Sequence, residues 1–152
     1  MTNGWDLDDN CWRPRSGSIA PGDVFLAPAP ELESTLHVAP DTDEVAFIAV
    51  RFSHALVTSR FRSWVVLVPI ILRANVEDQD AFDAATEEAR EAERTLRLPE
   101  LYGRWDGDAL VPLFRPFTLT ADILTSYPNE HMASMTDDDG EKVARRFARA
   151  FS

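Results

Sequence analysis

The stretch VAFIAVRFSHALVTSRFRSWVVLVPIIL, residues 45–72, is rich in the β-branched and aromatic residues that favour strands. It divides into three predicted strands, at residues 45–52, 55–59 and 64–72. The segment Arg60-Phe61-Arg62-Ser63 is a polar connection of hairpin length. Because the third strand is apolar at nearly every position, we expect both its faces to be covered, as in the centre of a small barrel.

Before this stretch, Pro21-Gly22-Asp23 is a turn signal that leads into a strand at residues 24–26. Residues 27–43 combine prolines with four acids, which favours a long surface loop with a short strand at residues 35–38.

Residues 1–20 lack helical or strand periodicity and form a predicted N-terminal tail. It holds two large apolar residues, Trp5 and Trp12. They either pack back on the domain or serve as exposed anchors for a partner, since Trp is favoured in interface hot spots.

After this stretch, Phe82, Ala85, Ala89, Ala92 and Leu96 recur at helical spacing and predict a helix over residues 80–98. Strands are expected at residues 109–114 and 117–119, and an amphipathic helix begins at the capping sequence Thr136-Asp137-Asp138-Asp139.

The predicted fold class is therefore mainly β (α+β). We expect one small β-barrel domain over residues 21–152, with an inserted acidic helix at residues 77–98 and a short C-terminal helix.

Composition narrows the function classes. The chain has 152 residues and a formal charge of -11, which disfavours direct nucleic-acid binding. One cysteine, Cys11, cannot form an intramolecular disulfide, and neither a signal peptide nor a membrane span is recognisable, so we expect a cytoplasmic protein without membrane contact.

The charge is segregated along the chain. Residues 47–75 contain four arginines, Arg51, Arg60, Arg62 and Arg73, and no acid, whereas residues 76–100 contain nine acids against three arginines. A basic segment is thus followed directly by an acidic one.

No motif predicts a cofactor or a metal. The three histidines, His37, His54 and His131, do not pair locally with acids at ligand spacing, and the chain has no phosphate-binding loop or serine-hydrolase elbow. We expect no cofactor and no metal ion.

The order of several segments resembles the PemK/MazF-like toxins. These segments are Gly22-Asp23-Val24-Phe25, the run from Ala55 to Ser59, and Val66-Leu67-Val68-Pro69-Ile70, followed by a later glycine-plus-strand segment and a terminal helix. The resemblance implies an SH3-like barrel, a homodimer, and metal-independent cleavage of single-stranded RNA.

Two departures stand against that activity. The family has an arginine beside a proline before the strand that ends in serine, where this chain has Ser53-His54, and a catalytic threonine after Val-Pro, where this chain has Ile70. The remaining candidates are His54 as general base, with Arg51, Arg60 and Arg62 holding the phosphate.

Three hypotheses follow. The first is a noncatalytic acidic module that binds, and can inhibit, a basic or nucleic-acid-associated protein, as in phage or mobile-element counter-defence; its predicted contacts are Glu87, Glu88, Glu91, Trp5 and Trp12. The second is a divergent endoribonuclease built on His54 and the arginines. The third is an accessory protein that mediates assembly.

Overall fold

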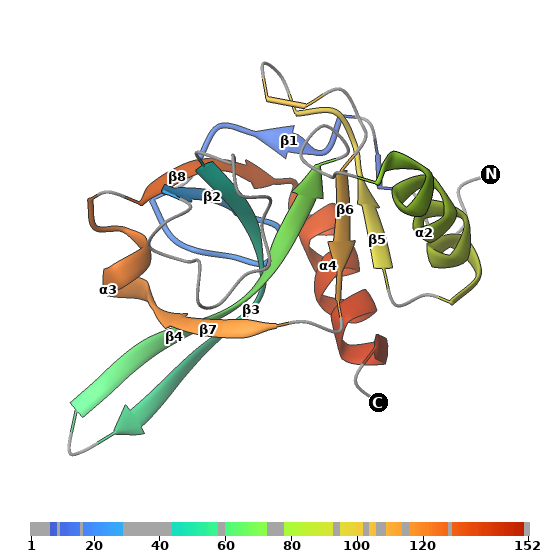
Figure 1. The fold of residues 1–152 in the computed structure, drawn as a ribbon. Coiled ribbons are helices and arrows are strands. Elements are labelled where there is room, and N and C mark those ends of the chain that lie inside the picture. Colours follow the sequence, from blue (N-terminus) through green and yellow to red (C-terminus); the bar gives the residue numbers. More distant parts are fainter. Residues whose placement is uncertain are drawn as a thin grey trace.

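The fold is described from a computed structural model. It describes residues 7–8, 10–15, 17–28, 44–57, 60–72, 78–92, 95–101, 104–105, 109–113, 116–127 and 129–150. Over these residues the fold is mainly β, and its strands form a curled antiparallel half-barrel (Figure 1).

The described strands pair in the order β1-β8-β2-β3-β4-β6-β5, and β7 pairs with β4. They are β1 (Trp12–Arg13), β2 (Val24–Pro28), β3 (Glu44–Val57), β4 (Arg60–Leu72), β5 (Thr95–Leu98), β6 (Ala109–Pro112), β7 (Phe117–Thr120) and β8 (Glu130–Met135). The helices are α2 (Gln79–Ala92), α3 (Ala121–Leu124) and α4 (Asp137–Ala150). The mainly β class and the strands after residues 23, 108 and 116 are confirmed.

The stretch 45–72 forms two long strands, and the prediction of three strands is wrong. β3 continues through Ser53 and His54 to Val57, and β4 begins at Arg60, so residues 60–63 are strand and not a connection. Polar residues do not interrupt a strand whose backbone groups are paired, and neither proline nor glycine stands at the expected breaks.

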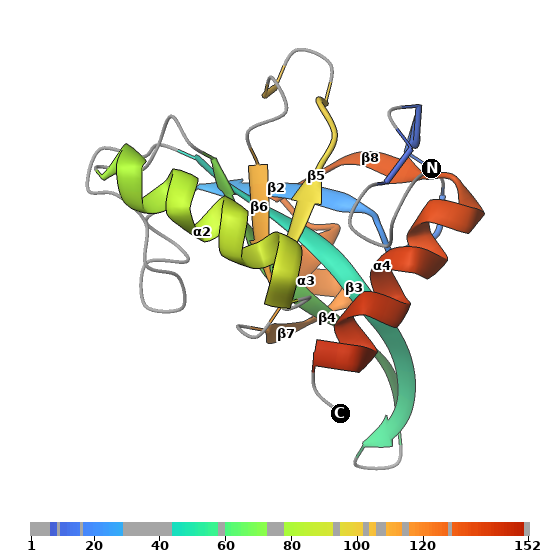
Figure 2. The same cartoon turned by 90° about the vertical axis from the view of Figure 1, so that its right-hand side faces the viewer.

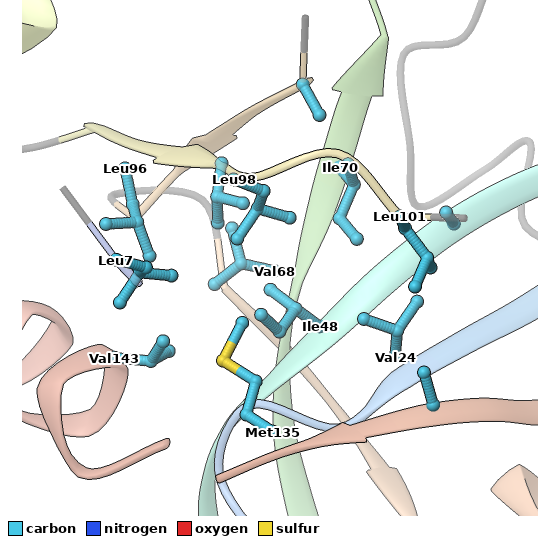
Figure 3. Close-up of a cluster of buried hydrophobic side chains, with 14 of the residues drawn as sticks. Leu7, Val24, Ile48, Val68, Ile70, Leu96, Leu98, Leu101, Met135 and Val143 are labelled. Carbon is cyan, nitrogen blue, oxygen red and sulfur yellow. The ribbon is translucent and has the colours of Figure 1, made fainter. Parts of the chain in front are cut away.

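Both faces of the sheet centre are buried, as predicted for the third apolar run. Even-numbered residues of β2, β3 and β4 contribute to one cluster, here called the major core, and odd-numbered residues to a second, here called the minor core. The minor core consists of Phe25, Ala27, Phe47, Ala49, Val65, Leu67 and Leu124. Figure 3 shows the major core, including Leu7, Val24, Ile48, Val68, Ile70, Leu96, Leu98, Leu101, Met135 and Val143. Successive residues of a strand point to opposite faces, and here each face is covered by a core, so apolar residues occur at nearly every position.

The acidic helix is shorter than predicted. α2 ends at Ala92, and residues 95–98, expected as its last turn, form β5 against β6. Leu96 and Leu98 are buried while Arg97 between them is exposed. This alternation fits a strand with one face on the core better than a helical turn.

The C-terminal helix is confirmed as α4. The Asp139 N–H donates to Thr136 Oγ1 at 3.3 Å, as expected of an N-cap threonine, and Thr136 Oγ1 donates to Asp139 Oδ2 at 2.9 Å. Val143 enters the major core, and α4 packs along β3 (Figure 2).

The described part of the predicted tail lies on the sheet. β1 pairs with β8, and Leu7 and Cys11 belong to the major core. The predicted strand at residues 35–38, Trp5 and Arg73 lie outside the described residues.

Candidate functional site

The predicted ribonuclease residues lie on one hairpin. Arg51 pairs with Val66, His54 with Ser63, Ala55 with Arg62, and Val57 with Arg60. Residues 51–57 of β3 and 60–63 of β4 are here called the arm, because they project beyond the rest of the sheet in both views (Figures 1 and 2).

The register separates the candidate base from the candidate phosphate-binding residues. Successive strand positions alternate between the two faces, and cross-strand partners share a face. Arg51, Arg60 and Arg62 therefore occupy one set of positions, whereas His54 belongs to the other set. The backbone does not bring the four residues to one face.

The arm has few neighbours in the sheet. β7 pairs with β4 only from Trp64 to Leu67. Among the described strands, residues 51–57 pair only with β4, and residues 60–63 pair only with β3. Arg51 is exposed, and Phe52 is 40% exposed, which is unusual for a phenylalanine.

The predicted acidic contacts lie on α2, on the opposite side of the body from the arm (Figures 1 and 2). Asp78 Oδ1 accepts from the Ala81 N–H at 3.0 Å and caps the helix. Phe82 is buried, with 6% exposure, while Glu87 and Glu88 are exposed. The backbone places Glu91 in the last turn.

Trp12 packs within the domain. Its ring meets Trp105 edge to face at a centroid distance of 6.1 Å, and both indole N–H groups donate to the Pro99 carbonyl, at 3.4 Å from Trp12 and 2.9 Å from Trp105. Of the two hypotheses for Trp12, packing on the domain or exposure as an anchor, the structure shows packing.

The sequence patterns did not identify a buried polar cluster at the start of β2. Asp23 is 1% exposed, and its Oδ2 lies 3.0 Å from Nε2 of His131 on β8, whose side chain is 10% exposed. Asp23 Oδ2 also accepts from the Ala20 N–H at 3.1 Å, and the Asp23 side chain hydrogen-bonds Ser134. The histidine ring stacks on Phe25 at 4.6 Å.

Burial dominates the electrostatics of this cluster. Desolvation raises the pKa of the Asp23 carboxyl, although the Ala20 N–H, His131 and Ser134 act in the opposite direction. The serine hydroxyl contacts the acid, and the imidazole is nearly covered. The arrangement links β2 to β8 and offers little surface to a substrate.

This pairing had no local signal, because Asp23 and His131 are far apart in sequence. The turn motif at Pro21-Gly22-Asp23 indicated only a strand start. The sequence shows His131 as an isolated histidine, and nothing near it indicates which residue it contacts.

A second buried cluster holds the N-terminal segment against α4. Asp139, 4% exposed, receives the Asp8 N–H on Oδ1 at 3.4 Å and lies 3.4 Å from Lys142 Nζ. Burial, reinforced by Asp139 and Asp8, raises the pKa of the Cys11 thiol to about 12. A thiol that stays protonated at neutral pH is a poor nucleophile.

Within the described ranges, no group of three or more histidine, cysteine, aspartate or glutamate side chains is arranged to hold a metal ion. In the same part of the chain, no helix is both long and apolar enough to cross a bilayer.

Comparison with known proteins gives no relative: no family, no curated protein and no solved structure matches this chain. The resemblance to PemK/MazF-like toxins therefore stays a prediction from short sequence segments.

Proposed function

We propose that this protein is a noncatalytic interaction module whose acidic helix α2 binds a basic protein partner. The observation that carries the proposal is the pair of exposed carboxylates Glu87 and Glu88 on a helix held to the body through Phe82. A helix fixed by one buried side presents its charged side without rearrangement.

The charge around α2 supports this choice. Residues 76–100 contain nine acids against three arginines, so the helix lies in a strongly negative part of the chain. Such a patch accelerates encounter with a basic surface and opposes encounter with an acidic one. We place the module in the cytoplasm and take the curled sheet as a divergent SH3-like barrel, both on the sequence argument alone.

Two features of the described site argue for binding over catalysis. The register assigns His54 and the arm arginines to alternate sets of positions. The Asp23 and His131 pair is buried and covered by Phe25. Acid-base chemistry needs its groups within reach of one substrate atom, and neither set provides that arrangement.

The divergent endoribonuclease is the second candidate, favoured by three arginines that share one set of arm positions. It is tested by cleavage of long single-stranded RNA by the wild type, His54→Ala and Arg60→Ala. Cleavage by the wild type that both variants lose would replace the binding proposal.

The binding proposal is tested with a fluorescently labelled arginine-rich peptide and fluorescence anisotropy. Glu87→Lys/Glu88→Lys should weaken binding by about tenfold, or ~1.4 kcal/mol, and reduce its salt dependence. The matched control is Asp122→Lys/Glu130→Lys, which changes the net charge equally at two exposed residues near α3. Equal losses in both variants would show that only bulk charge matters and would overturn α2 as the binding surface.

A further inference from the structure

The arm and α2 carry opposite charge and lie at opposite ends of the molecule (Figures 1 and 2). The arm contributes Arg51, Arg60 and Arg62 and no acid, whereas α2 exposes Glu87 and Glu88. Their separation keeps them from meeting within one chain. Two chains placed side by side in opposite directions would bring each arm to the other chain's helix.

Among the described strands, the arm is a two-stranded part of the sheet. A two-stranded ribbon is marginally stable in water without further packing, and no described strand flanks residues 51–57 or 60–63. Phe52, at the base of the arm, is 40% exposed. A surface that covers the arm would stabilise the two-stranded ribbon and bury the exposed Phe52 side chain.

We propose that the basic partner of α2 is the arm of a second copy of this chain, in a twofold dimer with two identical arm-to-helix contacts. This inference rests on the proposed function, because it names the partner of the same acidic helix. Reciprocal contacts close the assembly at two copies, whereas a one-sided contact would propagate into a filament.

Charge favours a second copy over a nucleic acid as the occupant of the arm. A nucleic acid is negatively charged along its whole length. The arm arginines would attract it, but the chain as a whole, with a net charge of -11, would repel it. A second copy also carries a net charge of -11, but its acids are segregated: residues 76–100 contain nine acids, and residues 47–75 contain none. Repulsion between the two bodies is screened beyond ~8 Å at physiological ionic strength, so the contacting side chains decide the outcome.

The test uses two charge-reversed chains and sedimentation velocity. Arg60→Glu/Arg62→Glu makes the arm acidic, and Glu87→Lys/Glu88→Lys replaces the two exposed acids of the helix with basic side chains. The wild type should be a dimer that dissociates at high salt, and each variant alone should be monomeric. Mixed in equal amounts, the two variants should form a heterodimer, because both of its arm-to-helix contacts again join opposite charges.

Three results would overturn the inference: a monomeric wild type at its highest soluble concentration, dimers in either variant alone, or no heterodimer in the mixture. A monomeric wild type whose arm arginines are needed to bind single-stranded RNA would assign the arm to nucleic acid. Unchanged thermal unfolding in both variants excludes misfolding as the cause of dissociation.

The two proposals fail separately. If the labelled peptide binds α2 but the wild type is monomeric, the interaction module stands and only the second copy is rejected. The other outcome is that the wild type dimerises, the two variants form a heterodimer, and peptide binding does not depend on Glu87 and Glu88. The helix is then specific for its own chain, and the binding of other basic proteins is rejected.

Discussion

β3 and β4 differ between their two ends. In the body, their residues lie between the major and minor cores, so Ile48 and Val68 face one cluster while Phe47 and Val65 face the other. A bulge between Ala49 and Arg51 shifts the register of the two strands where the arm begins, and in the arm they pair with no further described strand.

This difference separates stability from recognition along one hairpin. Apolar area removed from water contributes ~25 cal/mol per Å², so the doubly covered body carries the folding energy. The arm has no third strand beside it among the described residues, and Arg51 and Phe52 at its base are exposed, so its sequence is freer to carry charge. Substitutions should therefore be severe in the body and mild in the arm.

The largest effect is expected for Val68→Asp. Val68 is fully buried in the major core, and an isolated carboxylate there costs a large part of the ~5–15 kcal/mol that keeps a domain folded. Circular dichroism should show an unfolded or insoluble protein. Ala55→Asp in the arm is the control and should fold, with a stability change within ~0.5 kcal/mol. A folded Val68→Asp protein would contradict the placement of β4 in the core.

The next effect concerns the link between β2 and β8. Asp23→Ala removes the acceptor of the Ala20 N–H and the partner of His131, so it should destabilise the fold by about 2 kcal/mol in urea unfolding. Asp23→Asn keeps an acceptor oxygen and should cost less. Equal losses in the two variants would show that the acceptor is unimportant.

The same carboxyl gives a pH dependence. Burial raises the folded-state pKa of Asp23 above its ordinary 3.8, so the folded chain holds this proton more tightly than the unfolded chain. The contribution of Asp23 to stability must then fall as pH rises from 3.8 towards the raised folded pKa. The free energy of unfolding of the wild type minus that of Asp23→Asn should therefore decrease as pH rises through the acidic range. An increase of this quantity with pH would contradict the raised pKa.

Cys11 gives the third effect, at the junction of the N-terminal segment and α4. Its folded pKa of about 12 exceeds the ordinary 9.0, so the unfolded thiol ionises first as pH rises. Stability should fall between pH 9 and 12, by at most ~1.4 kcal/mol per pH unit. Cys11→Ala should lack this component. In the wild type at neutral pH, the thiol should react with a thiol reagent only after denaturation.

The sequence predicted the parts of the fold that depend on local chemistry. Thr136 caps α4 through a hydroxyl, and the apolar run in β4 implied burial on both faces. It missed where β3 ends, because Ser53 and His54 resemble a turn unless the pairing of the arm is known.

The candidate site was predictable only where it is contiguous. The arginines of the arm and the acids of α2 are visible as charge segments of the sequence. The Asp23 and His131 pair arises from the β2–β8 register, which joins residues from the two ends of the chain. No periodicity within either segment encodes that contact.

The smallest effect should come from Phe52 and sharpens the comparison most. Phe52 and Phe47 lie on the same strand, but Phe47 is fully buried in the minor core and packs on Phe25 and Phe117, whereas Phe52 is 40% exposed. Phe52→Thr keeps a strand-forming residue and should change stability by no more than ~0.5 kcal/mol, while Phe47→Thr should cost ~3 kcal/mol or more. The urea midpoints of the two variants measure this. If monomeric Phe52→Thr is destabilised as strongly as Phe47→Thr, the arm belongs to the folding core, and its charge would then serve the chain itself rather than a partner.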